Sequence, residues 1–452
     1  MTLATAATIL GGELHGADVR FSGVSTDSRS IRKGELFVAL RGERFDGHDF
    51  LPAIAAAGAA AALVERDRAA AAPLPVAAVA DTTAALAALA AHWRRRFSIP
   101  LIAVAGSNGK TTVKEMIAAC LRAGFGDAAV LATQGNLNNH IGLPLTLLSL
   151  RDTHRAAVVE IGMNHPGETA QLAEIAAPTI ALVNNAQREH QEFMHSVAEV
   201  AEEHASLIRA LPEDGVAVIN GDDAHATTWK KAAASRQVRD FGLGGAACVR
   251  AHGRCGPSSS VLEVTTPEAQ ARFELPVAGE HNARNALAAI AAATAAGVPL
   301  AVCAGALSRF AAVRGRLQVK AGLRGATLID DTYNANPDSV RAAIDVLAGM
   351  PGRRLLVLGD MGEVGSQGAA FHEEVGAYAR RSGVHRLFTL GDLAAAAAAA
   401  FGEGARHYTR IEDLLAEVSR DLGPQAAVLV KGSRFMRMER VVRACEISGA
   451  EG

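Results

Sequence analysis

The strongest chemical signal in this chain is a glycine turn that leads directly into a lysine and a threonine. In LIAVAGSNGKTTVKEMIAACL, an apolar strand-like run precedes the turn and a helical pattern follows it. Backbone N–H groups of such a loop can surround phosphate oxygens, while Lys110 neutralises the terminal phosphates and the Thr111 hydroxyl binds Mg²⁺. The loop is compact, because Val104 stands where GxxxxGK[ST] has its first glycine. The alternative is a glycine turn with a solvated lysine. We predict an ATP site that includes Gly106, Ser107, Asn108, Gly109, Lys110, Thr111 and Thr112.

Two more side chains are expected at the same edge of the sheet. Glu160 ends the apolar run AAVVEIG, and His190 lies in NNAQREHQEF, just after the next such run. The carboxyl ends of parallel strands meet at one edge, and a hard cation that bridges phosphates takes oxygen ligands. Alone, a strand-end Glu is more often a cap and a loop His more often structural. Beside the loop, we predict Lys110, Glu160 and His190 as the catalytic residues, with Glu160 on Mg²⁺ and His190 on a second metal ion.

The elements that must position these residues are continuous apolar runs separated by helical patterns. Such runs predict buried parallel strands in βαβ units. A hairpin-like segment, SSSVLEVTT followed by ARFELPV, precedes alanine-rich helices at 283–311. The strand-like runs fall at 101–105, 156–162, 179–185 and 215–220, and again at 326–331, 354–360, 385–392 and 426–433.

Length and local pattern together predict three domains of α/β class. The 452 residues suggest about three domains at roughly 150 residues each. The first 80 residues combine a strand-like run at 36–40 with a helix-like run at 52–64, and Asp81 can cap a helix through 84–97. We expect a small N-terminal α/β module, a central P-loop parallel-sheet ATPase-like domain and a C-terminal Rossmann-like domain, at 1–82, 83–312 and 313–452.

The composition is typical of an ordinary globular protein and excludes several classes. Hydrophobic residues make up 49% and charged residues 20%, which argues against disorder. The 45 basic and 47 acidic side chains give no global field for nucleic acid or membrane, so we expect neither as a partner. Five scattered cysteines without a CxxC pair argue against disulfides and zinc. No secretion signal or apolar span is evident, so we expect a cytoplasmic monomer in which the alanine runs 55–64 and 394–401 are surface-packed helices.

Eight motifs in register resemble those of the Mur ligases, and the resemblance starts at STDSR (25–29) and covers nearly the whole chain. Within the family, YNANP and GNLNN resemble the branch that adds D-alanyl-D-alanine to UDP-N-acetylmuramoyl-tripeptide, and the DNPR-type motif of the preceding tripeptide-forming branch is missing. The motifs are GSNGKTT, GNLNNHIGLPLTLL (135–148), VVEIGMNHPGE (158–168), GEHNARNALAA (279–289), RGR (314–316), DDTYNANPDS (330–339), LGDMGEVG (358–365) and KGSR (431–434).

The resemblance implies ATP-driven amide synthesis in peptidoglycan precursor assembly, with ATP and Mg²⁺ as cofactors. The substrate carboxylate would take the γ-phosphoryl group, and the amine of D-alanyl-D-alanine would then displace phosphate. The resemblance also implies an ATP site between the second and third domains, and we expect open and closed arrangements of these domains. The implied nucleotide residues are Asn282 and Asn285 near adenine, Arg316 on phosphate, Asp330 or Asp331 on ribose, and Tyr333, Asn334 and Asn336 in the cleft.

The resemblance also assigns residues to the other two substrates. The last domain would bring D-alanyl-D-alanine, with Lys431, Ser433 and Arg434 as candidates for its carboxylate or for closure over ATP. For the UDP-linked substrate, Arg29 or Arg41 would pair with pyrophosphate, although each taken singly is equally compatible with a solvated loop charge. The residues implied for the UDP-linked substrate are Ser25, Asp27, Ser28, Arg29, Arg41, Asp46, Gly47, His48, Asn138 and Asn139.

One position departs from the family pattern. Many Mur ligases carry a carbamylated lysine that helps to hold the second Mg²⁺, and the corresponding position here is His204, in AEEHASLI. Our hypothesis is that His204, or the neighbouring Glu202 or Glu203, replaces it as a direct or water-mediated ligand. The expected metal set is therefore Thr111, Glu160, His190 and His204. The alternative functions are another amide ligase of the superfamily, similar to folylpolyglutamate synthetase, a P-loop kinase, or an inactive binding module.

Overall fold

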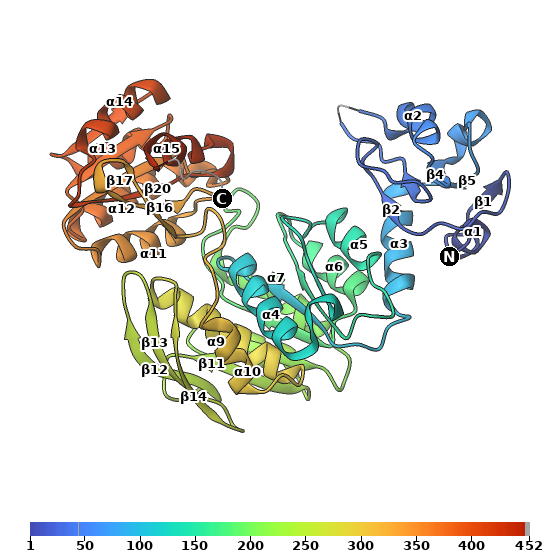
Figure 1. Ribbon diagram of the computed structural model, residues 1–452, viewed down its shortest axis with the longest axis horizontal. Helices are drawn as coiled ribbons and strands as arrows, with labels where there is room; N and C mark the ends of the chain where they lie inside the picture. Colours follow the sequence, from blue (N-terminus) through green and yellow to red (C-terminus); the bar gives the residue numbers. More distant parts are fainter. Residues whose placement is uncertain (44, 448–452) are drawn as a thin grey trace.

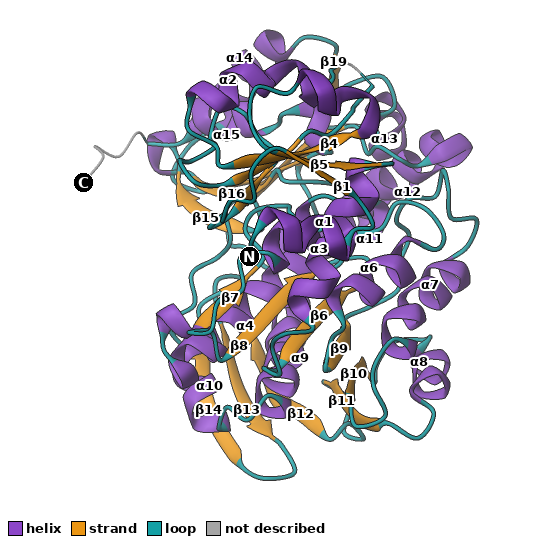
Figure 2. Cartoon of the chain, turned by 90° about the vertical axis from the view of Figure 1, so that its right-hand side faces the viewer, coloured by secondary structure: helices purple, strands orange, loops and turns teal. Residues whose placement is uncertain are grey.

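The computed structural model describes residues 1–43 and 45–447, which form three α/β domains, or layers of the molecule, each built around its own sheet. The first and third layers lie on the same side of the central one, at its opposite ends (Figure 1). Figure 2 shows both of them above the central sheet after a 90° turn. The predicted α/β fold with three domains is confirmed. Within the described residues, no helix has the length and apolar character that crossing a membrane requires.

The first sheet has the order β1-β5-β4-β3-β2 and mostly parallel pairing. The prediction of a helix over 55–64 was wrong, because the helix ends at Ala56 and 61–65 form a buried strand. Gly58 turns the chain between them at φ +86°, and the buried alanine and valine side chains outweigh local helix propensity. The elements are α1 (Leu3–Ile9), β1 (Glu13–His15), β2 (Val24–Ser25), β3 (Leu36–Val38), α2 (Leu51–Ala56), β4 (Ala61–Glu65) and β5 (Val76–Val79).

Helix α3 (Thr82–Arg94) connects the first sheet to the central one. The predicted cap is confirmed, because the Asp81 side chain accepts hydrogen bonds from the backbone N–H groups of Thr83 and Ala84. At its other end, the buried Arg94 donates to the carbonyl of Ala176 in the central domain. The helix therefore packs mainly on the central layer, against α5 (Gly142–Leu147) and α6 (Glu168–Ala176).

The central sheet has the order β14-β13-β12-β11-β10-β9-β6-β8-β7, parallel from β7 to β12 and antiparallel beyond. One face is covered by α3, α5, α6 and α7, and the other by α4, α9 and α10, so the central strands β6, β8 and β9 are buried on both sides. The predicted hairpin is β13–β14. The further elements are β6 (Leu101–Ala105), α4 (Lys110–Phe125), β7 (Val130–Ala132), β8 (Ala156–Glu160), β9 (Ile180–Val183), α7 (Val197–Arg209), β10 (Val216–Asn220), α8 (Ala226–Ala233), β11 (Gln237–Gly242), β12 (Val249–Cys255), β13 (Ser260–Thr265), β14 (Gln270–Leu275), α9 (Glu280–Ala295) and α10 (Leu300–Leu307).

The third sheet has the order β15-β16-β20-β17-β18-β19, with parallel pairing except for β15. Helices α11, α12 and α13 cover one face, and α14 and α15 cover the other. The helix predicted at 394–401 is confirmed as α13. The elements are β15 (Gln318–Ala321), β16 (Thr327–Asp331), α11 (Pro337–Ala348), β17 (Arg353–Gly359), α12 (Gly368–Arg381), β18 (Arg386–Leu390), α13 (Ala394–Phe401), β19 (Ala405–Tyr408), α14 (Ile411–Asp421), β20 (Ala426–Lys431) and α15 (Glu439–Cys445).

Candidate active site

A cavity of about 570 Å³ lies where the carboxyl ends of the central strands face the third domain. Its walls come from both domains, as expected for a ligand that binds between them. Among the predicted residues, it brings together Ser107, Asn108, Gly109, Lys110, Thr111, Thr112, Asn138, Asn139, Glu160, His190, Asn282, Asn285, Arg316, Asp331, Tyr333, Asn334, Asn336 and Lys431. The predicted residues outside its lining are Gly106, His204, Asp330, Ser433, Arg434 and all those of the first domain.

The glycine turn has the geometry of a phosphate-binding loop. The buried strand β6 ends at Ala105, and α4 begins at Lys110. Gly106 and Gly109 both have positive φ, at +138° and +82°, which glycine adopts without steric cost. A Cβ at Gly109 would lie 2.6 Å from the Asn285 side-chain oxygen. The loop therefore requires glycine at this position for its conformation and for its close contact with α9.

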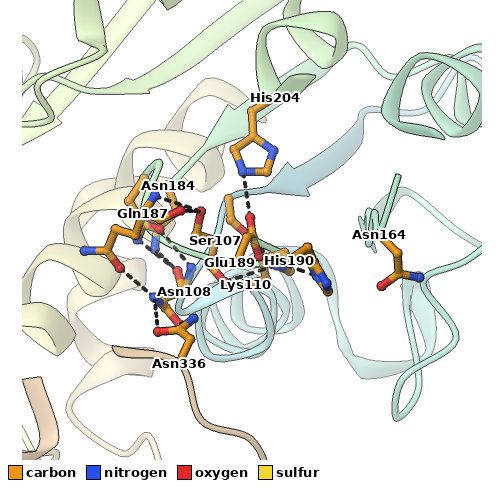
Figure 3. Close-up of polar contacts among 12 residues, drawn as sticks. Ser107, Asn108, Lys110, Asn164, Asn184, Gln187, Glu189, His190, His204 and Asn336 are labelled. Atoms are coloured by element: carbon orange, nitrogen blue, oxygen red, sulfur yellow. Dashed lines mark hydrogen bonds and ion pairs between the residues drawn. The ribbon is translucent and has the colours of Figure 1, made fainter. Parts of the chain in front are cut away.

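Lys110 is held by a carboxylate that the sequence reasoning missed. Its Nζ donates to the Gly106 carbonyl at 2.5 Å and lies 3.3 Å from Oε2 of Glu189 (Figure 3). Oε1 of Glu189 accepts a hydrogen bond from His204 Nε2 at 3.1 Å. Burial opposes ionisation of Glu189, but Lys110, His204 and His190 outweigh it and hold its pKa at about 2. Glu189 is thus a buried, ionised carboxylate beside the phosphate loop. Its place next to His190 in the sequence was the available signal.

Thr111 and Glu160, the two oxygen-bearing side chains predicted for Mg²⁺, lie in direct contact. The Thr111 hydroxyl donates to Oε2 of Glu160 at 2.9 Å, and Asn138 Nδ2 donates to Oε1 at 2.8 Å. The backbone N–H of Glu160 donates to the Thr133 hydroxyl. In the described part of the chain, no three His, Cys, Asp or Glu side chains are grouped as metal ligands. Mg²⁺ usually takes one or two carboxylates together with waters and phosphates, so this pair fits it.

Of the residues expected at a second metal ion, the structure places only His190 in the cavity lining. His190 faces the cavity, with Nε2 3.9 Å from Oε2 of Glu189 and Nδ1 2.8 Å from Glu363 of the third domain. The buried His204, on α7, does not line the cavity but lies behind Glu189. Glu203 accepts hydrogen bonds from two backbone N–H groups at the start of α6, and Glu202 is exposed and pairs with Arg209. Glu202 and Glu203 are therefore turned to other partners.

Side-chain amides connect the loop to α9 and to the third domain. Asn184, which follows β9, donates to Asn285 at 3.0 Å, and Asn285 donates to Asn282 at 3.0 Å. Across the cavity, Asn336 Nδ2 donates to Asn108 Oδ1 at 3.0 Å (Figure 3). Asn336 also caps α11, so its direction is fixed by the helix that it begins. Sequence reasoning missed Asn184, although the doubled asparagine after a strand was a usable signal.

Of the two aspartates proposed for ribose, only Asp331 lines the cavity. Consecutive side chains of a strand point to opposite faces, and Asp330 on β16 instead lies 3.2 Å from Lys320. Oδ2 of Asp331 accepts a hydrogen bond from the buried Lys431 at 2.5 Å. Ser433 is buried and bonded to the backbone of the third domain, whereas the Arg434 side chain is 69% exposed.

Apart from Asn138 and Asn139, which line the cavity, the residues proposed for the UDP-linked substrate lie in two parts of the first domain. Arg29 and Asp27 form an exposed ion pair at 2.7 Å. The buried His48 contacts Asp46 at 2.5 Å, and Arg41 lies 3.5 Å from Asp46. The His48 ring also accepts a hydrogen bond from a backbone N–H of β4, which fixes this loop to the sheet. Ser25 ends β2, Ser28 follows Asp27 in the adjoining turn, and Gly47 begins a short 3-10 helix.

Comparison with known proteins agrees with this arrangement along the whole chain. Residues 20–94, 104–293 and 315–434 match the Mur ligase family catalytic domain, the Mur ligase middle domain and the Mur ligase glutamate ligase domain. The UDP-N-acetylmuramoyl-tripeptide--D-alanyl-D-alanine ligase of Escherichia coli is 40% identical over 453 residues, covering 99% of each chain. The chain belongs to the Mur ligase family.

Two solved structures show that this Mur ligase shares its fold with relatives. A MurF from Acinetobacter baumannii superposes with a TM-score of 0.91 at 33% identity and covers 98% of each chain. The MurF ligase of Thermotoga maritima, solved in complex with ADP, gives a TM-score of 0.81 at 27% identity, covering 93% of this chain and 96% of that one.

In this Mur ligase, an ion-pair cluster that the sequence reasoning missed joins the central and third domains. Arg188 contacts Asp338 of α11 at 2.6 Å and Glu374 of α12 at 2.6 Å. Its backbone N–H also donates to Asp338 at 2.9 Å. The hydrogen bonds that the Arg188 guanidinium donates to the carboxylates of Glu374 and Asp338 raise the pKa of Arg188. We call Arg188, Asp338 and Glu374 the Arg188 clamp.

The linker between the same two domains of the Mur ligase carries Arg316. Gly315 and Leu317, on either side of it, have positive φ of +70° and +51°. The Arg316 guanidinium lies 4.2 Å above the Tyr333 ring and donates to the Thr111 hydroxyl at 2.8 Å. A residue of the linker thus reaches the phosphate loop of the neighbouring domain.

Proposed function

We propose that this Mur ligase uses ATP to join D-alanyl-D-alanine to the C-terminal carboxylate of UDP-N-acetylmuramoyl-tripeptide, releasing ADP and phosphate, in peptidoglycan precursor synthesis. The observation that carries the proposal is the full-length 40% identity to a relative named for this reaction. The geometry supports it, because the phosphate loop, Glu160 and Arg316 of the linker line one cavity.

The first step transfers the γ-phosphoryl group to the substrate carboxylate, with ADP as the leaving group. Lys110 and Arg316 are proposed to neutralise the phosphate charge as the bond to ADP breaks. Thr111 and Glu160 are proposed to hold Mg²⁺, which would supply further charge neutralisation and orient the phosphates. Asp331 is proposed for the ribose hydroxyls, with Asn282 and Asn285 near adenine. Such a reaction needs positioning and electrostatics more than a covalent nucleophile.

In the second step, the amine of D-alanyl-D-alanine attacks the acyl carbon and phosphate leaves. We propose that Arg434 binds the dipeptide carboxylate, since its guanidinium is exposed, whereas Lys431 and Ser433 are bonded internally and hold the loop. The first domain is proposed to hold the UDP group through Arg29 and Arg41, whose guanidinium groups suit pyrophosphate.

We also propose that the enzyme works in the cytoplasm as a monomer. Both ATP and a UDP-linked precursor are cytoplasmic compounds, and all the residues proposed for the two steps belong to one chain.

The test is phosphate release from ATP and Mg²⁺ with UDP-N-acetylmuramoyl-tripeptide, with and without D-alanyl-D-alanine, followed by mass spectrometry of the products. The proposal expects phosphate release that depends on both substrates and a product with the mass of the UDP-pentapeptide. A kinase would phosphorylate the tripeptide substrate without an amine acceptor. A ligase of different specificity would turn over only with another amine, such as L-glutamate.

A further inference from the structure

Lys114 is a fully buried charge one helical turn after the threonine of the phosphate loop. Its side chain is 0% exposed, although lysine is almost never fully buried unless it is paired. The neighbouring buried positions of α4, Val113, Met116 and Ile117, are apolar and pack in the core. An apolar side chain would therefore suit this position for packing alone, so the presence of a charge requires another explanation.

The Lys114 ammonium group contacts two partners. Nζ donates a hydrogen bond to the Thr133 carbonyl oxygen at 2.8 Å, and it also pairs with Glu115, the next residue of the helix. The Glu115 side chain is 34% exposed, so it would stay solvated without Lys114. The contact that depends on the lysine is the one to Thr133. This residue follows β7 directly and begins the loop that carries Asn138 into the cavity.

Thr133 connects Lys114 to the end of β8. The buried Thr133 hydroxyl accepts a hydrogen bond from the backbone N–H of Glu160 at 3.0 Å, and the Glu160 carboxylate accepts one from the Thr111 hydroxyl at 2.9 Å. Thr111 and Lys114 lie three positions apart on α4, a spacing that places both side chains on one side of the helix. The four residues thus close a ring of polar contacts between α4, β7 and β8. Thr111 and Glu160 line the cavity, whereas Lys114 and Thr133 lie behind them.

This ring bears on the metal because Thr111 and Glu160 are the two residues proposed for Mg²⁺. Partners behind a metal ligand set its direction, and their loss typically lowers metal affinity by about 10- to 100-fold. Mg²⁺ demands near-ideal octahedral geometry. A shift of the strand end relative to the helix should therefore weaken the metal more than it weakens the phosphates alone.

We propose that Lys114 is a positioning residue for the Mg²⁺ ligands. Through Thr133, it holds the end of β8 at the distance from α4 that lets Thr111 and Glu160 share one ion. A purely structural role would instead change the stability of the central domain without changing the metal affinity of the folded protein. The inference rests on the proposed function, because the ion is the one that accompanies the phosphates of ATP.

The test is the binding of Mn²⁺ to the full chain, measured by electron paramagnetic resonance in the presence of the β,γ-imido analogue of ATP. K114M keeps the length of the side chain and removes its charge, and T133V keeps the shape of the side chain and removes its hydroxyl. Each variant should lower the affinity for Mn²⁺ by about tenfold, while the Kd of the analogue in EDTA stays as in wild type. Because both changes act on the same ring, the double variant should lose little more than either single one.

Two matched variants serve as controls. T133S, which restores a hydroxyl, should recover most of the affinity that T133V loses. K230M removes a lysine that pairs with Asp240 at the surface of the same domain, and it should match wild type.

Two outcomes would overturn the inference. One is that folded K114M binds Mn²⁺ as tightly as wild type. The other is that K114M weakens the analogue equally in EDTA and in Mn²⁺, because Lys114 would then act on the phosphate loop as a whole. Urea unfolding shows whether K114M is folded, and T133V tests the same ring if it is not. Formation of the UDP-pentapeptide by the wild type is measured in parallel, because its absence would refute the proposed function and leave the Mn²⁺ comparison intact.

Discussion

Replacing Arg188 with glutamine cuts the ion pairs that join the central domain to α11 and α12. Hydrogen bonds between charged groups contribute about 1.5 to 3 kcal/mol when shielded, and exposed ion pairs about 0.2 to 1 kcal/mol. The Arg188 and Asp338 side chains are each 21% exposed, and that of Glu374 is 33% exposed. We therefore assign about 1.5 kcal/mol to the contact with Asp338 and about 0.5 kcal/mol to the contact with Glu374, which keeps Arg341 as a second partner.

The loss of about 2 kcal/mol should lower the population of the closed arrangement by about 30-fold relative to the open one. If ligation requires closure, kcat/KM for ATP in R188Q should fall by up to that factor. Small-angle scattering with a bound ATP analogue should show a larger radius of gyration than for wild type. R209Q is the matched control, because Arg209 pairs with Glu202 inside the central domain.

A double-mutant cycle of R188Q with D338N measures the coupling directly. The reasoning would be refuted by a coupling energy in kcat/KM below about 0.3 kcal/mol, the level at which independent sites are additive. It would also be refuted if R188Q closed over the nucleotide like wild type. Either result would mean that the clamp forms without favouring one arrangement of the domains.

Three further predictions concern the loop, the pH dependence and the first domain. K110A should lower kcat by about 10²- to 10³-fold, and an unchanged rate of ADP formation would contradict the assignment. Burial lowers the pKa of His281 to about 4, so the unfolded chain takes up a proton first as pH falls. The free energy of unfolding should decrease between pH 6.5 and 4 by at most about 3 kcal/mol, and H281Q should flatten this slope in urea titrations. A Cβ at Gly47 would lie 2.6 Å from the Leu40 carbonyl oxygen, so G47A should destabilise the first domain by about 1 to 3 kcal/mol in thermal melts; G423A, in open space, should not.

The sequence analysis predicted correctly those structural features that depend on residues close together in the chain. The phosphate loop, the strand-end Glu160 and the capped helix at Asp81 are each specified by neighbours a few residues away. The run at 55–64 was misjudged because alanine favours helices locally, and only the flanking strands make β4 a strand. A choice between Asp330 and Asp331 required knowing which face of β16 meets the cavity.

The missed residues depend on partners that are distant in the sequence. Arg188 and Asp338 are 150 positions apart, and the pattern of either segment alone shows only a solvated loop charge. Glu189 is separated from Lys110 by 79 positions, and its burial follows from the packing of α7 behind it. Such pairs depend on how domains and helices pack together, which periodicity and turn signals do not encode.

Because Arg316 lies in the linker, its contact with the phosphate loop depends on the relative position of the central and third domains. The chain passes from one domain to the next through Gly315, Arg316 and Leu317, and the middle residue of these three touches the threonine of the phosphate loop. A rotation of the third domain about this segment cannot leave the guanidinium where it is. Separation of the domains therefore moves the positive charge of Arg316 away from the phosphates. An open molecule would have its two domains apart and would also lack one of the charges that neutralise ATP. The linker that would let the domains move therefore also carries a group that acts on the phosphates.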